Sequence, residues 1–143
     1  MDIFNMTLQD FLEIEPILIS DFDDLWNANI LKSELENTNS QYIVAKINNE
    51  IVGFAGVWFS VDDSHITNIV VKKSARHTGI GSKLLEKLIN LTKEQNKLSL
   101  TLEVNTKNIP AQNLYLKYGF ENLGTRKKYY NGIEDAFIMT LYF

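Results

Sequence analysis

Apolar residues recur along the chain with two periods, one typical of helices and one typical of strands. Residues 79–96 follow the helical period, and residues 98–104 then alternate strictly between apolar and polar side chains. The first pattern predicts an amphipathic helix, and the second predicts a strand with one buried face. The helix is expected to bury Ile80, Leu84, Leu85, Leu88, Ile89 and Leu91, and the strand to bury Leu98, Leu100, Leu102 and Val104.

Turn and capping residues divide the rest of the chain. Asn48-Asn49-Glu50 joins two β-rich runs into a hairpin over 41–60, and a third strand follows at 65–71. Asn108 is expected to cap a short helix that has Pro110 in its first turn and ends at Gly119. Further helices are predicted over 7–20 and 28–37, and further strands over 120–130 and 134–143, with Thr7 or Asp10 and Asn27 as helix caps. This order predicts a mixed α/β sheet with helices on both faces.

Composition narrows the class of protein. A chain of 143 residues with 45% hydrophobic content is expected to form one domain over 1–143. The absence of cysteine excludes disulfides, thiolate metal sites and a cysteine nucleophile. A formal net charge of −4 argues against broad nucleic-acid binding and mildly favours a cationic partner. The first thirty residues are acidic, and no apolar run approaches the roughly 20 residues of a membrane span, so a cytoplasmic protein is expected.

A glycine-containing turn lies between the predicted strand at 65–71 and the long helix. It reads Arg76-x-x-Gly79-x-Gly81, and unpaired N–H groups at a helix start bind phosphate oxygens. A dinucleotide fingerprint would need glycine at position 84, and a mononucleotide loop would need lysine directly after the glycine; Leu84 and Ser82 stand there. The turn is therefore a different kind of anion site, or its glycines serve only helix–strand packing.

This turn resembles the acetyl-coenzyme A pyrophosphate loop of the GCN5-related N-acetyltransferases. The similarity extends over essentially the whole chain and is most specific in LEV-N-x-x-N, in A-x-x-LY-x-x-x-GF and in YY-x-x-x-EDA. Within that superfamily the chain is most similar to the bacterial ribosomal-protein-alanine N-acetyltransferases. The resemblance implies a mixed, mostly antiparallel central sheet of six to seven strands with helices on both faces.

The resemblance also implies acetyl-coenzyme A as the acetyl donor, with no metal. The main chain of Ile69, Val70 and Val71 would pair with the pantetheine arm as an added strand. Asn108 would contact the cofactor besides capping its helix. The pyrophosphate would lie against His77, Thr78, Gly79, Ile80, Gly81 and Ser82, with Arg76 as a nearby charge. His77 is interpreted as a surface residue beside this loop, and His65 as an exposed strand residue.

Two residues carry the implied catalysis, although each also has a structural interpretation. Glu103 matches the general base of the family, and is otherwise a solvated strand glutamate. Tyr115 matches the acid that protonates the leaving thiolate, and is otherwise a core residue. Since an unperturbed glutamate pKa of about 4.3 suits a base poorly, we expect Glu103 to act through a water or with a pKa raised by burial.

The implied acceptor is the α-amine of an N-terminal alanine on a protein of the small ribosomal subunit. Neither nucleic acid nor a membrane is expected as a partner. An α-amine with a pKa near 8 needs only a modest base. A small amine or polyamine acceptor, and a non-catalytic coenzyme A-binding module, stay open, and a monomer is favoured. Leu25-Trp26-Asn27 departs from the family where the acceptor pocket is shaped. Glu134 and Asp135, with Glu34 and Glu36, could attract a basic peptide or be only solvated.

Overall fold

Seven strands form one sheet in the computed structural model, which describes residues 1–22, 28–130 and 132–143. The strand order is β1-β2-β3-β4-β5-β7-β6, and all neighbours are antiparallel except β4 and β5. The strands are β1 (Asp2–Asn5), β2 (Ser40–Ile47), β3 (Glu50–Phe59), β4 (Asp63–Val71), β5 (Ser99–Asn105), β6 (Glu121–Tyr130) and β7 (Glu134–Tyr142). The predicted mixed, mostly antiparallel sheet is therefore confirmed.

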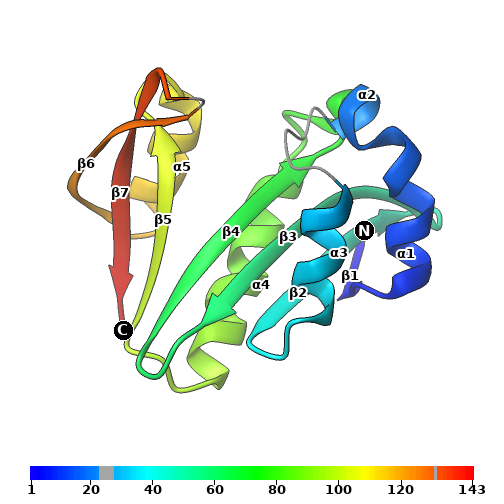
Figure 1. Cartoon of the computed structure of the whole chain (residues 1–143), viewed down its shortest axis with the longest axis horizontal. Coiled ribbons are helices and arrows are strands. Elements are labelled where there is room, and N and C mark those ends of the chain that lie inside the picture. Colours follow the sequence, from blue (N-terminus) through cyan, green and yellow to red (C-terminus); the bar gives the residue numbers. More distant parts are fainter. Residues whose placement is uncertain (23–27, 131) are drawn as a thin grey trace.

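Helices cover both faces of this sheet (Figure 1). The α-helices are α1 (Leu8–Ile14), α2 (Leu18–Phe22), α3 (Ala28–Glu36), α4 (Ile80–Glu94) and α5 (Ile109–Lys117), and the 3-10 turns are η1 (Glu15–Ile17) and η2 (Lys73–Ala75). One core lies under α1, α2 and α3, and the other lies under α4. Among the described residues, no helix is long and apolar enough to cross a membrane.

The N-terminal helices differ in one respect from the prediction. The helix expected over 7–20 is split into α1, η1 and α2, with Pro16 in η1. Proline lacks the N–H that continues an α-helix, which explains the change to a 3-10 turn. Thr7 caps α1, since its side chain accepts from the Asp10 N–H while the Asp10 carboxylate accepts from the Thr7 N–H. The other proposed cap, Asn27, lies outside the described residues.

The long helix and the strand after it bury nearly all the residues expected of them. Every residue of the predicted α4 stripe is buried, and so are Leu100, Leu102 and Val104 of β5. Leu98 was wrongly predicted to be buried, because it precedes β5 and is 59% exposed. The hairpin turn is confirmed, with positive φ angles of 51° at Asn48 and 66° at Asn49.

The parallel pair of strands is short, and this opens the sheet. Pairing between β4 and β5 runs only from Asp63–Ser99 to His65–Thr101. Beyond these pairs the two strands diverge, so the molecule has the shape of a V with β1–β4 on one arm and β5–β7 on the other (Figure 1). In the described part of the chain, the residues of β4 after His65 therefore meet no strand along their β5-facing edge.

A β-bulge lies on β4 just where it leaves β5. Gly56 pairs with Asn68 and Val57 pairs with Ile66, which leaves Thr67 as an extra residue. The Tyr42 ring packs directly over Gly56, and its hydroxyl lies 2.8 Å from the Thr67 hydroxyl. Glycine at position 56 thus lets a tyrosine from β2 reach across β3 and hold the bulge.

We expect Gly56→Ala to destabilise the protein, because a Cβ atom at this position would overlap the Tyr42 ring. Overpacking of this kind lowers the free energy of unfolding by about 1–3 kcal/mol. Gly124→Ala is the matched control, since a Cβ there meets nothing within 4 Å. Urea unfolding of both variants tests this, and equal stabilities would contradict the packing described here.

Candidate functional site

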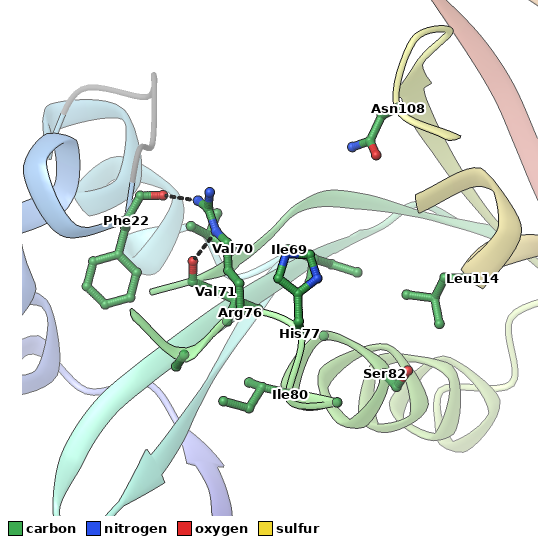
Figure 2. A pocket seen from close by; sticks show the side chains of 13 residues that line it. Phe22, Ile69, Val70, Val71, Arg76, His77, Ile80, Ser82, Asn108 and Leu114 are labelled. Carbon is green, nitrogen blue, oxygen red and sulfur yellow. Dashed lines mark hydrogen bonds between the residues drawn. The ribbon is translucent and has the colours of Figure 1, made fainter. Parts of the chain in front are cut away.

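A cavity of about 540 Å³ lies around the turn between β4 and α4, and we call it the glycine-turn cavity. Figure 2 shows its lining side chains, which come from α2, β4, the turn and α4 on one side and from the start and middle of α5 on the other. All the residues predicted to contact the cofactor line it, except Thr78. The Thr78 hydroxyl instead donates to the Ala75 carbonyl at 2.5 Å, which stabilises the turn. Apart from Thr78, the residues that the sequence predicted to contact the cofactor therefore lie around one cavity.

The turn presents backbone N–H groups to this cavity. No side chain caps α4, whose first paired N–H is that of Lys83, bonded to the Gly79 carbonyl at 3.2 Å. Within the described residues, the N–H groups of Ile80, Gly81 and Ser82 therefore have no partner. Gly79 has a φ of 85°, which L side chains rarely adopt, so glycine is required there by conformation. Free amides at the positive end of a 15-residue helix make an anion site.

Arg76 has a structural role that the sequence did not indicate. Its Nε donates to the Val71 carbonyl at 3.1 Å, and its Nη2 donates to the Phe22 carbonyl at 3.2 Å (Figure 2). The guanidinium group thus ties the turn to the end of α2. Its charge stays close to the glycine-turn cavity, as expected.

A second cavity of about 550 Å³ fills the gap where β4 and β5 diverge, and we call it the inter-strand cavity. Glu103 from β5 and Tyr115 from α5 both line it, so the structure brings the two predicted catalytic residues together. Ile69 and Asn108 line both cavities. The anion site and the predicted catalytic pair therefore lie in adjacent cavities that share these two lining residues.

Asn108 occupies the position predicted from its capping role. Its Oδ1 accepts from the Ala111 N–H at 3.2 Å at the start of α5. Its place at the junction of the two cavities comes from the β5–α5 turn. The cap prediction is confirmed, and the cofactor contact stays a prediction.

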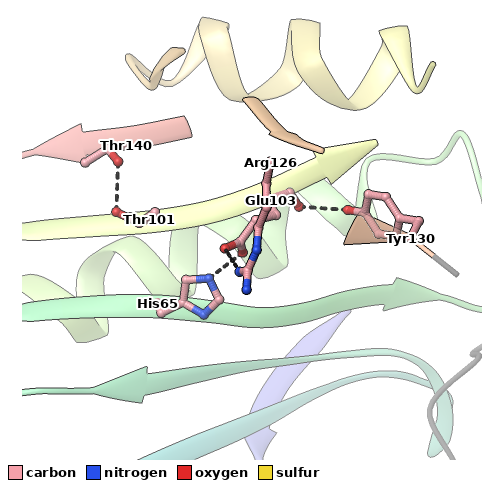
Figure 3. A network of polar contacts seen from close by, with 6 residues as sticks. All are labelled: His65, Thr101, Glu103, Arg126, Tyr130 and Thr140. Atoms are coloured by element: carbon pink, nitrogen blue, oxygen red, sulfur yellow. Dashed lines mark hydrogen bonds and ion pairs between the residues drawn. The ribbon is translucent and has the colours of Figure 1, made fainter. Parts of the chain in front are cut away.

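The Glu103 carboxylate is held by two side chains, the His65 imidazole and the Arg126 guanidinium group (Figure 3). His65 Nε2 lies 2.5 Å from one carboxylate oxygen, and Arg126 Nη1 lies 3.4 Å from the other. Tyr130 donates its hydroxyl to the Glu103 carbonyl at 3.2 Å. His65 was interpreted as an exposed strand residue, and this is wrong: its side chain is only 35% exposed and pairs with Glu103.

Comparison with known proteins gives the family. The model of the acetyltransferase (GNAT) family matches residues 3–120. The chain belongs to this family. It is an acetyl-coenzyme A-dependent N-acetyltransferase, so the acetyl donor expected from the glycine turn is the donor of this enzyme.

Similar proteins span nearly the whole of this GNAT chain. A candidate ribosomal protein bS18-alanine N-acetyltransferase of Bacillus subtilis is 39% identical over 138 residues, which cover 94% of this chain and 91% of the relative. The ribosomal protein bS18-alanine N-acetyltransferase of Haemophilus influenzae is 36% identical over 123 residues, which cover 82% of each chain. The crystal structure of the Escherichia coli ribosomal-protein-S18-alanine N-acetyltransferase superposes with a TM-score of 0.89 at 27% identity, covering 99% of this chain and 92% of the other.

The charge state of Glu103 in this acetyltransferase follows from its neighbours. Burial alone would raise the pKa of the carboxyl group, but the hydrogen bond and charge of His65 and the charge of Arg126 outweigh it, so the pKa is lowered. Of the two expectations for Glu103, a raised pKa is therefore wrong, and action through a water stays a prediction. Glu103 is an ionised carboxylate at neutral pH, able to accept a proton directly or through water.

Tyr115 is protonated at neutral pH, in contrast to the ionised Glu103. Burial raises the pKa of its hydroxyl to about 12, so the phenol stays protonated at neutral pH. Its ring packs against Phe120 with the ring centroids 5.8 Å apart, which fixes its orientation. The core interpretation and the acid interpretation of Tyr115 are thus compatible.

The acidic residues expected near a peptide acceptor are mostly paired. Asn105 donates to the Glu134 carboxylate, and Lys107 lies 3.5 Å from it. The Asp135 carboxylate accepts from the Lys128 N–H at 2.8 Å and lies 3.3 Å from Lys127. These neighbours offset both charges, which weakens the idea that Glu134 and Asp135 attract a basic peptide. The segment Leu25-Trp26-Asn27, where the sequence departs from the family pattern, lies outside the described residues.

Sequence reasoning missed several side chains that line the inter-strand cavity or pair with its charges. His65 and Arg126 pair with Glu103, and Tyr129 lines the cavity beside Tyr130. The YY-x-x-x-EDA motif already marked both tyrosines, and so could have indicated them. His65 had no such signal, because its contact with Glu103 depends on the parallel register of two strands.

We expect Gly81→Glu to weaken coenzyme A binding without unfolding the enzyme. A Cβ at position 81 lies 3.9 Å from Val71, so a side chain fits, but its carboxylate would sit beside the free amides. The dissociation constant should rise at least about tenfold, or about 1.4 kcal/mol. Calorimetry measures this, with Gly124→Glu as a control for the added charge. A folded variant with wild-type affinity would contradict the anion-site assignment.

Proposed function

We propose that this enzyme transfers the acetyl group of acetyl-coenzyme A to the N-terminal alanine α-amine of ribosomal protein bS18. One observation carries the choice of acceptor: the 39% identity to a candidate bS18-alanine N-acetyltransferase holds over 94% of this chain. An archaeal N-alpha-acetyltransferase of Sulfurisphaera tokodaii, 34% identical over 73% of the chain, also favours an α-amine. A ribosomal acceptor implies that the enzyme works in the cytoplasm, and a monomer is sufficient for the site described here.

The residues of the glycine-turn cavity fit the donor. The free N–H groups of Ile80, Gly81 and Ser82 would hold the pyrophosphate. The edge of β4 that faces β5 pairs with no strand beyond His65, so the main chain of residues 69–71 can bond the amides of the pantetheine arm. Asn108, at the junction of the cavities, would contact the cofactor where the arm passes into the inter-strand cavity.

Glu103 is proposed as the general base. As the amine nitrogen attacks the thioester carbonyl, a C–N bond forms and the nitrogen must lose a proton. The ionised Glu103 carboxylate can take it, directly or through one water. His65 and Arg126 keep the carboxylate deprotonated, and His65 also fixes its orientation.

Tyr115 is proposed as the general acid. When the C–S bond breaks, the electron pair leaves with sulfur, and the Tyr115 hydroxyl can donate a proton to the coenzyme A thiolate. With a pKa of about 12, the phenol still carries that proton at any pH where the enzyme works. The chain has no cysteine to carry the acetyl group, so direct transfer within a ternary complex is proposed.

The acceptor class is tested with an alanine-starting basic peptide, the same peptide with a blocked N-terminus, and polyamines. Mass spectrometry should detect one acetyl group on the α-amine of the free peptide and none on the blocked peptide. Acetylation of polyamines or other small amines alone would reject the proposed acceptor. Comparison of N-terminal acetylation of ribosomal proteins in cells with and without the enzyme tests the choice of bS18.

The two catalytic roles are separated by their dependence on pH. Glu103→Gln cannot accept a proton, so kcat/KM for the peptide should fall roughly 10²–10⁴-fold near neutral pH. This loss should shrink toward pH 9.5, because a larger fraction of the α-amine, with a pKa of about 8, is then already neutral. Tyr115→Phe lacks the donor for the thiolate, and its loss should not shrink in step with amine deprotonation.

Single-turnover rates from about pH 6 to 9.5 measure both effects. Circular dichroism confirms that each variant is folded. Parallel pH profiles of the two variants, or near wild-type rates in either one, would reject the assigned roles.

A further inference from the structure

Asn68 of β4 holds the only buried side-chain nitrogen and oxygen atoms without a hydrogen-bond partner in the described part of the chain. A carboxamide buried without partners costs free energy, because water satisfies its donors and its acceptor in the unfolded chain. Such a group in a folded protein requires an explanation. A ligand that supplies both missing partners would provide one.

The position of Asn68 favours the acceptor end of the site. It follows the β4 bulge at Thr67, where β4 has already left β5. It lines the inter-strand cavity together with Glu103 and Tyr115, and it does not line the glycine-turn cavity. A ligand that meets Asn68 therefore lies next to the catalytic pair and away from the pyrophosphate.

The chemistry of the side chain favours a peptide. A carboxamide offers one acceptor oxygen and two donor hydrogens. In an extended chain, the N–H and C=O of one residue point to the same side, as in the residue pairs of an antiparallel ladder. These two groups match the carboxamide, whereas the ammonium groups of a polyamine provide donors only.

We infer that Asn68 binds the main chain of the second residue of the acceptor peptide. Its Oδ1 accepts from the N–H of that residue, and its Nδ2 donates to the carbonyl of the same residue. This rests on the proposed function, since it needs a peptide whose α-amine lies at Glu103. Because the carboxamide is buried in the free enzyme, it turns about its side-chain torsion angles into the cavity when the peptide binds.

Asn68 is thus a positioning residue that separates peptides from small amines. The α-amine is held more tightly at the catalytic pair when a second residue provides both main-chain groups. The pantetheine arm of the donor also contains amides, but the unpaired edge of β4 offers main-chain partners to those. The Asn68 carboxamide is therefore available to bind the acceptor peptide.

The test compares Asn68→Leu with the wild-type enzyme and with Asn5→Leu. Asn5 lies on β1, at the far edge of the sheet, and its side chain accepts a hydrogen bond from Gln41. Two acceptors are used: an alanine-starting basic peptide, and its ester analogue in which oxygen replaces the N–H of the second residue. Steady-state kinetics give KM for each acceptor and for acetyl-coenzyme A, and thermal unfolding gives Tm.

In Asn68→Leu we expect KM for the peptide to rise about tenfold. The kcat and the KM for acetyl-coenzyme A should stay within about twofold of wild type. Tm should be unchanged or higher, because the unpaired carboxamide is gone. The ester should be a several-fold poorer acceptor than the peptide for wild type and for Asn5→Leu, and equal to the peptide for Asn68→Leu.

An unchanged peptide KM in folded Asn68→Leu would overturn the inference, and so would a raised KM for acetyl-coenzyme A in its place. An equal ester penalty in all three enzymes would do the same. If leucine at position 68 prevents folding, the wild-type comparison alone decides, since equal kcat/KM for peptide and ester overturns the inference. A wild-type enzyme that acetylates only polyamines overturns the proposed function as well, which distinguishes the two failures.

Discussion

The short parallel contact between β4 and β5 is the constraint on which the rest of the structure depends. Three residue pairs join these strands, and beyond them the facing edges of β4 and β5 no longer pair with each other. Backbone groups inside a sheet are normally paired, so an edge exposed in the middle of a sheet requires a ligand or water as its partner. The divergence thus creates the inter-strand cavity and the free edge of β4 at the same time. Glu103, Tyr115 and Asn68 are functional candidates because they border this opening.

Burial raises the pKa of both proposed catalytic groups, but only Glu103 has partners that reverse the effect. Among the described residues, Tyr115 has no charged partner to compensate for desolvation, so its phenol is held protonated. Glu103 is also partly buried, but His65 and Arg126 oppose that effect and keep it ionised. One cavity therefore holds an acid and a base in their reactive forms at the same pH. The difference arises from His65 on β4 and Arg126 on β6, which contact the two oxygens of the Glu103 carboxylate.

Local features of this fold could be predicted from the sequence, and contacts between distant segments could not. The α4 stripe, the Asn48-Asn49 turn and the Asn108 cap depend on neighbouring residues, and all three are confirmed. Leu98 fits the alternation of β5 but lies before the strand begins, since periodicity does not fix element ends. The contact between His65 and Glu103 joins residues 38 positions apart through the strand register, which the sequence pattern does not specify. The acetyl donor was predicted because its motif is local, whereas the bulge at Thr67 depends on pairing with β3.

The anion site at the start of α4 is made from main chain, and this has an evolutionary consequence. Amides at Ile80, Gly81 and Ser82 are present whatever side chains those positions carry. Selection on the site therefore falls on conformation and free space, which are encoded by Gly79 with its φ of 85° and by the small residue at position 81. Neighbouring positions are left free to drift, so homologous enzymes can retain one donor while the residues around it diverge. A change of acceptor is constrained differently, because that end of the site is bordered by side chains such as Glu103 and Asn68, which substitution would alter.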